Sequence, residues 1–236
     1  MPTIAIVILN YLLILAAIIL FASPFYLLFR SRRKNAPGKL VINKEAEDFF
    51  QSKQANLLVF FWAFGEALVW FVIPEFLLLL VIFLRIRRKR ELLFYDIYGT
   101  AAGTVVAYVI NLPVHLIDKL PYIQPKMVEQ TQVWYRNHGI LGLIYQPFSG
   151  VPYKVFTFLA PHYHFFILLF LAAAIVVRVA RYYIFFAMFS LIYPVLHKYV
   201  YKNYARLFLV AVFIFSILLL RVYDSYGPGH LVTILR

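Results

Sequence analysis

The sequence predicts an all-α integral membrane protein, a helical bundle that contains two opposed re-entrant hairpins. Three observations lead to this fold class. Of the 236 residues, 64% are hydrophobic and only 14% are charged, whereas a soluble domain carries about 25% charged residues. Two long apolar segments, Leu57–Leu84 and Gly139–Pro161, are interrupted by proline near their middles. Lysine and arginine gather in short stretches between apolar segments, as they do in the cytoplasmic loops of membrane proteins.

The first element is a transmembrane helix at about Ile4–Phe29, followed by a basic loop. Its apolar run exceeds the roughly 20 residues that cross a bilayer, and no basic segment precedes it. We therefore expect a retained helix and not a cleaved signal peptide. We divide the chain into this N-terminal unit at 1–40, a core with both hairpins at 41–197, and a C-terminal helix and tail at 198–236.

The first broken segment has a strongly basic stretch on each side. Residues 30–53 hold seven lysines and arginines, and residues 85–90 hold five. The positive-inside rule places both stretches in the cytoplasm, but a single crossing by Leu57–Leu84 would leave one of them outside. A hairpin that turns near Pro74 and returns to the cytoplasmic side removes the conflict. A kinked helix that crosses fully remains the alternative.

The middle of the chain predicts one helix and a second hairpin. Asp96–Val114 contains Gly-Thr-Ala-Ala-Gly at Gly99–Gly103, a small-xxx-small pattern that lets a neighbouring helix approach closely. Pro113 marks the end of that helix, and residues 115–138 are expected at the membrane interface. In Gly139–Pro161 the hairpin breaks fall at Pro147, Gly150 and Pro152.

The last two apolar stretches, His164–Leu196 and Leu207–Leu220, are predicted to cross the membrane. Together these elements describe a multi-pass protein of the cell membrane. The net charge of +13 fits cytoplasmic loops and anionic or phosphate-bearing lipid head groups as partners, and we expect no nucleic-acid partner. A homo-oligomer is left open.

Two carboxylates in the first broken segment, Glu66 and Glu75, are the main functional candidates. On one continuous helix they would lie on opposite faces, so one would risk facing lipid. A break at Pro74 lets both turn inward, toward a polar cavity. We expect them to serve transport or proton coupling.

Three cations at similar depth are the expected partners of these carboxylates, and they are candidates for binding a phosphate or head group. They are Lys154, Arg178 and Arg181. Arg178 and Arg181 are three residues apart and so share a helix face. The alternative is that all of these charges form structural ion pairs that hold the hairpins.

The sequence gives little support to catalysis or metal binding. There is no cysteine, so thiol chemistry is excluded. His162 and His164 at a helix end are more typical of the interface than of a metal site. We therefore expect no cofactor, no metal and no enzymatic activity.

The segment GILGLIYQPFSGVPYKVFTFLAP resembles the DedA superfamily, also called the VTT or SNARE-associated Golgi family, and is nearest to its YqaA-like branch. The residues that match the pattern of the second hairpin are Gly139, Gly150, Val151, Pro152, Tyr153 and Lys154. Glu66, Pro74 and Glu75 resemble the acidic first hairpin, and Arg178 with Arg181 resembles the basic pair in the following helix. The first arginine of the family pattern falls at Gln146 in this chain. The resemblance implies two facing re-entrant hairpins and the transport or scrambling of lipids, with proton coupling.

The resulting hypothesis is a membrane transporter, a lipid translocase, flippase or scramblase for a phospholipid or polyprenyl phosphate. The first alternative is a structural or assembly protein whose buried charges are only ion pairs. A less favoured alternative is a membrane enzyme that acts on lipid phosphates, which would need a nucleophile or metal that the sequence does not supply.

Overall fold

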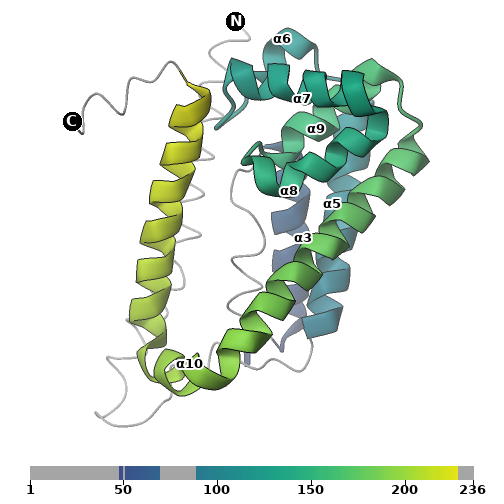
Figure 1. The fold of residues 1–236 in the computed structure, drawn as a ribbon. Coiled ribbons are helices and arrows are strands. Elements are labelled where there is room, and N and C mark those ends of the chain that lie inside the picture. The colour runs from purple at the N-terminus through teal and green to yellow at the C-terminus, as the bar shows by residue number, and fades with distance from the viewer. Residues whose placement is uncertain (1–47, 50, 70–88, 228–236) are drawn as a thin grey trace, which may run out of the picture.

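The computed structural model describes residues 48–49, 51–69 and 89–227, and this part of the chain is helical, with no strand. Figure 1 shows an upright helix pair, a group of short helices at one end, and one long bent helix beside them. The helices are α3 (Lys53–Leu68), α5 (Lys89–Ile110), α6 (Val114–Ile117), α7 (Pro125–His138), η1 (Gly139–Tyr145), α8 (Gln146–Ser149), α9 (Tyr153–Leu159), η2 (Ala160–Tyr163) and α10 (Ile167–Tyr226).

The upright pair consists of α3 and α5, which run parallel to each other. Near their beginnings, Asn56 Nδ2 donates a hydrogen bond to Glu91 Oε1 at 2.9 Å. Further along, Gly99 lies against Phe60. The two helices therefore start at the same end of the molecule.

Two glycines bring α5 into direct contact with the backbone of α3. A Cβ added at Gly99 would lie 2.1 Å from the carbonyl oxygen of Phe60, and one added at Gly103 would lie 2.7 Å from that of Phe64. The small-xxx-small prediction for this helix is confirmed. The predicted start is wrong, because α5 begins at Lys89 and places Asp96 well inside the helix. Its end agrees, since α5 stops at Ile110 and Pro113 precedes α6.

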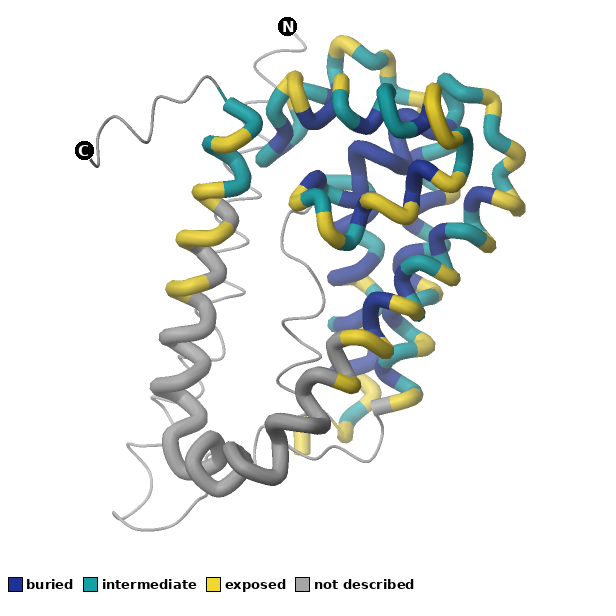
Figure 2. The backbone as a smooth tube through the Cα atoms, in the orientation of Figure 1, coloured by how far each residue is buried: buried dark blue, intermediate teal, exposed yellow. Residues whose placement is uncertain are grey.

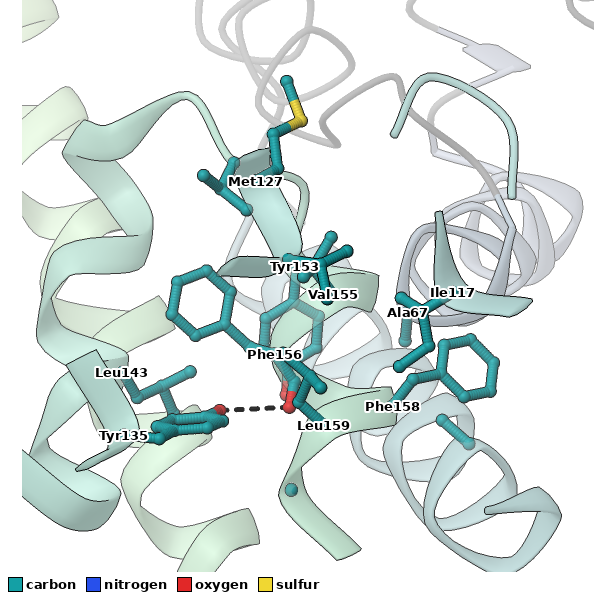
Figure 3. Packing of buried hydrophobic residues seen from close by; sticks show 14 of the residues in the cluster. Ala67, Ile117, Met127, Tyr135, Leu143, Tyr153, Val155, Phe156, Phe158 and Leu159 are labelled. Carbon is teal, nitrogen blue, oxygen red and sulfur yellow. Dashed lines mark hydrogen bonds between the residues drawn. The ribbon is translucent and has the colours of Figure 1, made fainter. Parts of the chain in front are cut away.

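The hydrophobic core lies where α9 meets α7 and the ends of α3 and α5. Figure 3 shows Phe156 among these side chains, with the hydroxyl of Tyr135 on α7 bonded to the Phe156 carbonyl at 3.0 Å. Every residue of α9 is buried. A seven-residue helix buried on all sides is fixed by its neighbours, so α9 is a firm platform for the side chains that it carries.

The segment Gly139–Pro161 is a helix, a break and a helix. Gly150 has φ +74°, a left-handed conformation that glycine adopts at little cost, and it ends α8. Pro152 immediately precedes α9. The chain leaves the helical conformation at Gly150 and Pro152, whereas Pro147 lies in the first turn of α8 and begins that helix instead of interrupting one.

The two predicted C-terminal helices are arms of one bent helix, α10, which has 60 residues. If straight, it would be about 90 Å long. Yet Arg181 on its first arm lies 3.4 Å from Gln146, and Tyr226 in its last turn bonds to Ser149, so both arms reach α8. Figure 1 shows the sharp bend between them. The first arm runs antiparallel to α5, with the Tyr108 hydroxyl bonded to the Phe165 carbonyl at 2.7 Å.

Two described helices are long and apolar enough to cross a membrane, at Arg90–Ile110 and Ile167–Ile184. Only 33% and 28% of the residues in these windows are buried, so most positions on both helices are at least partly accessible at the surface. Figure 2 shows exposed positions along both helices and along α3. Many of these are large apolar residues, such as Phe61, Val109 and Val176. A surface of this kind is typical of contact with lipid.

Candidate functional site

A buried ionic cluster joins α3, α5 and α10. Arg178 Nε donates to Asp96 Oδ2 at 3.0 Å, and Arg178 Nη2 donates to Glu66 Oε2. The hydroxyl of Tyr182, one turn along α10, donates to the same oxygen of Asp96. All four side chains are buried, with exposures of 0 to 6%. One guanidinium therefore links both helices of the upright pair to the first arm of α10.

In this cluster two carboxylates share one guanidinium. Breaking a buried pair by removing one partner leaves an uncompensated charge and costs about 3–5 kcal/mol. Arginine suits this position because its planar guanidinium presents several N–H donors in different directions. Arg178 is thus the residue on which the cluster depends.

Aromatic and hydroxyl side chains extend the polar region from the cluster toward α9. The guanidinium carbon of Arg178 lies 5.7 Å from the ring centre of Tyr153 and 5.9 Å from that of Tyr182, both within cation–π range. The hydroxyl of Thr104 donates to the Thr100 carbonyl at 2.7 Å, so the Tyr153 hydroxyl donates to Thr104 at 2.9 Å. Buried polar contacts therefore connect Arg178 on α10 with Tyr153 on α9 and Thr104 on α5.

Lys154 is the third buried cation, but its partners are backbone carbonyls. It has no exposed surface, and its Nζ donates to the carbonyl of Val69 at 2.8 Å and to that of Pro121. Val69 is the residue that ends α3. The ammonium thus fastens α9 to the end of α3 and to the loop that precedes α7.

Arg181 lies on the same buried face of α10 as Arg178, as predicted from their spacing, and is 7% exposed. Its Nη1 approaches Gln146 Oε1 at 3.4 Å. Gln146 begins α8, so this contact connects the first arm of α10 to the first half of the second broken segment. The two arginines therefore contact different parts of the bundle.

The structure brings together Glu66 and Arg178, two candidates 112 positions apart in the sequence. Glu75 and Pro74 lie outside the described residues. Asp96 is a member of the site that sequence reasoning missed, because it was placed in the first turn of its helix, where aspartate is common. The signal that would have found it is a carboxylate well inside an apolar helix that begins at Lys89.

No group of three histidine or carboxylate side chains in the described part of the chain is placed to hold a metal ion. His162, weighed above as a metal ligand, instead has its Nε2 at 2.9 Å from the carbonyl oxygen of Leu112. This contact fastens η2 to the turn after α5. The buried cluster itself offers carboxylates, a guanidinium and a hydroxyl.

Comparisons with protein-family models, with curated proteins and with solved structures find no match for this chain. The motif resemblance to the DedA superfamily therefore rests on the residues quoted for it.

Proposed function

We propose that this protein is a multi-pass membrane transporter that moves a phospholipid or polyprenyl phosphate between leaflets, with proton coupling. The observation that carries the proposal is the buried Arg178 held by Glu66 and Asp96. Ionisable side chains inside a membrane bundle are costly, and they are retained mainly where they line a path for a proton or substrate. The apolar, exposed faces of α3, α5 and α10 support a bilayer around the cluster.

The parallel pair α3 and α5 supports a first re-entrant hairpin. The hydrogen bond from Asn56 to Glu91 holds both helix starts at one end of the molecule, beside the basic stretches. In the proposed topology the chain enters the membrane along α3, returns to the cytoplasmic side, and then crosses along α5. This arrangement keeps both basic stretches in the cytoplasm.

The second broken segment supports a hairpin that enters from the opposite side. Its beginning and its end both lie against α7, since η1 follows α7 directly and Tyr163 in η2 donates to the Gln132 carbonyl of α7 at 3.1 Å. Its returning helix, α9, meets the end of α3 through Lys154 and Thr157. Two hairpins whose inner ends meet are the arrangement that gives a site access from both leaflets.

In the proposed mechanism, the carboxylates control the guanidinium. While Glu66 and Asp96 are ionised, they occupy donors of Arg178. A proton taken up by either carboxylate weakens its attraction for Arg178, which can then offer donors to a phosphate head group. Phosphate binding and proton binding are thereby linked through one side chain.

The test uses purified protein in liposomes that carry fluorescent phospholipid in both leaflets. Dithionite bleaches the outer leaflet, so bleaching beyond that fraction measures exchange between leaflets. We expect exchange with the unmodified protein, and its loss in Glu66→Gln, Asp96→Asn and Arg178→Gln. Arg221→Gln, which changes an exposed arginine of α10, is the matched control and keeps the activity.

A fluorescent polyprenyl phosphate analogue and an imposed pH gradient are run beside the phospholipid, so that substrate class and proton coupling are separated. If bleaching stops at the outer leaflet for both lipids and in both gradients, the transport proposal is wrong.

A second candidate, a structural or assembly protein, is favoured by a specific observation. Arg178 has carboxylate partners and Lys154 has carbonyl partners, as expected for side chains that hold helices together. If the protein is structural, a variant that keeps the fold also keeps whatever activity the unmodified protein has. Folded Glu66→Gln protein that has lost lipid exchange would therefore exclude the structural candidate.

A further inference from the structure

The end of α3 is capped by two side chains of α9. Lys154 Nζ donates to the carbonyl oxygen of Val69, the residue that ends the helix. One turn further along α9, Thr157 Oγ1 lies 2.9 Å from the carbonyl oxygens of both Ala67 and Lys154, and its single proton is shared between them. The same ammonium also donates to the carbonyl oxygen of Pro121, in a loop far from α3 in the sequence.

Carbonyls at the end of a helix attract positive charge. The last carbonyls of an α-helix have no partner within the helix, and the helix dipole places partial negative charge on them. In transporters with interrupted helices, such helix ends and unwound backbone carbonyls coordinate Na⁺. Here carbonyl oxygens from two separate segments converge on one buried positive charge, which is the same arrangement with an ammonium in place of a metal ion.

We propose that Lys154 is a tethered cation, which fills a monovalent-cation site formed by the end of α3 and the loop at Pro121. Because the ammonium is covalently attached, the site stays filled without external Na⁺ or K⁺. Lysine suits this role, since its ammonium is compact and has three donors in a tetrahedral arrangement. The inference concerns how the end of α3 is held, and it does not depend on lipid transport.

This role differs from the phosphate-binding role predicted for Lys154 from the sequence. The ammonium has no exposed surface, and its bonds go to Val69 and Pro121. Because the ammonium is enclosed, a phosphate could reach it only after Lys154 separates from at least one of these carbonyls. Holding the carbonyls and binding a phosphate are therefore competing uses of the same charge.

The test measures thermal unfolding of the purified full-length protein in detergent, in NaCl, KCl, methylammonium chloride and N-methylglucamine chloride at equal ionic strength. N-methylglucamine is too large for the vacated space. The unmodified protein is expected to have the same Tm in all four salts. Lys154→Ala removes the ammonium and leaves room, so its Tm is expected to fall by roughly 5–10 °C in N-methylglucamine and to rise again in a small cation.

Two further variants separate the charge from its surroundings. Lys154→Met fills the space without a charge, so its Tm is expected to be low in every salt. Lys126→Met makes the same change at an exposed lysine of α7 and should leave the Tm unchanged. Lys154→Ala could be too unstable to purify in N-methylglucamine chloride. In that case, folded protein obtained only when cells are extracted in methylammonium chloride supports the proposal.

Three results would overturn the proposal. One is an unmodified protein whose Tm rises specifically in NaCl or KCl, because the carbonyls would then bind an external ion. Another is Lys154→Met with the Tm of the unmodified protein, because the charge would then be dispensable. The third is a Lys154→Ala variant whose Tm is the same in all four salts, or one that yields no folded protein in any of them.

Discussion

Replacing Arg178 by methionine is expected to destabilise the protein strongly, and restoring charge balance is expected to reverse the effect. Arg178→Met keeps much of the side-chain volume but leaves Glu66 and Asp96 buried, at 2% and 0% exposure, without their shared partner. Removing one member of a buried ionic group costs about 3–5 kcal/mol. At roughly 2–4 °C of Tm per kcal/mol for a chain of this size, the expected fall is on the order of 10 °C.

The assay is thermal unfolding in detergent, followed by loss of the monodisperse peak in size-exclusion chromatography. Arg221→Met is the control, because it makes the same change at an exposed position of α10. The triple variant Glu66→Gln, Asp96→Asn, Arg178→Met removes every charge of the cluster at once. It is expected to recover most of the lost Tm, since well-packed neutral groups replace buried ion pairs at little cost.

The same variants separate the two candidate functions. In the transport proposal the triple variant is stable and inactive, because no group remains to exchange a proton or hold a phosphate. In the structural alternative the triple variant is stable and still supports the assembly role of the protein, because its buried charges serve only to hold the helices together. The reasoning is refuted if Arg178→Met unfolds at the temperature of Arg221→Met, because the guanidinium would then contribute nothing to holding the helices.

Two glycine substitutions give further predictions. Gly99→Ala should lower the Tm, because the added Cβ would lie 2.1 Å from the carbonyl oxygen of Phe60. This clash should outweigh the preference of about 1 kcal/mol for alanine over glycine inside a helix. A raised Tm would refute the close contact between α3 and α5. Gly150→Ala should also lower the Tm, both through its left-handed φ of +74° and through a Cβ placed 2.6 Å from Val222. Val222→Ala added to Gly150→Ala should recover the steric part of that loss, and no recovery would mean that the C-terminal arm of α10 does not pack there.

The sequence allowed the helical class, the close-packed glycines and the break at Gly150 to be predicted, because each depends on local chemistry. Glycine spacing reports how near another helix can come, and a left-handed turn requires glycine wherever it occurs. The buried face shared by Arg178 and Arg181 follows equally from helical periodicity. These features can be predicted without knowing which residues of distant helices they contact.

The partners of the buried charges could not be predicted in the same way. Lys154 was expected to pair with a carboxylate, but its hydrogen bonds go to backbone carbonyls, which any sequence supplies. Asp96 was overlooked because the start of its helix was misplaced by about two turns. Which carbonyls are free to accept, and which side chains reach them, depends on how distant helices pack.

The two cations that hold the inner helices differ in what can release them. Arg178 is held by carboxylates, which can take up protons, whereas Lys154 is held by carbonyls, which do not do so near neutral pH. A proton arriving inside the bundle would therefore loosen α10 from α3 and α5 while leaving α9 fastened to the end of α3. In the proposed transporter, the first arm of α10 is then the part that moves, and the contact between α3 and α9 is the fixed support against which it moves. The rate of disulfide formation can be compared at each pH for one cysteine pair across α10 and α5 and another across α9 and α3, which removes the pH dependence of the thiols themselves. The ratio of the two rates should change as the pH falls below neutral.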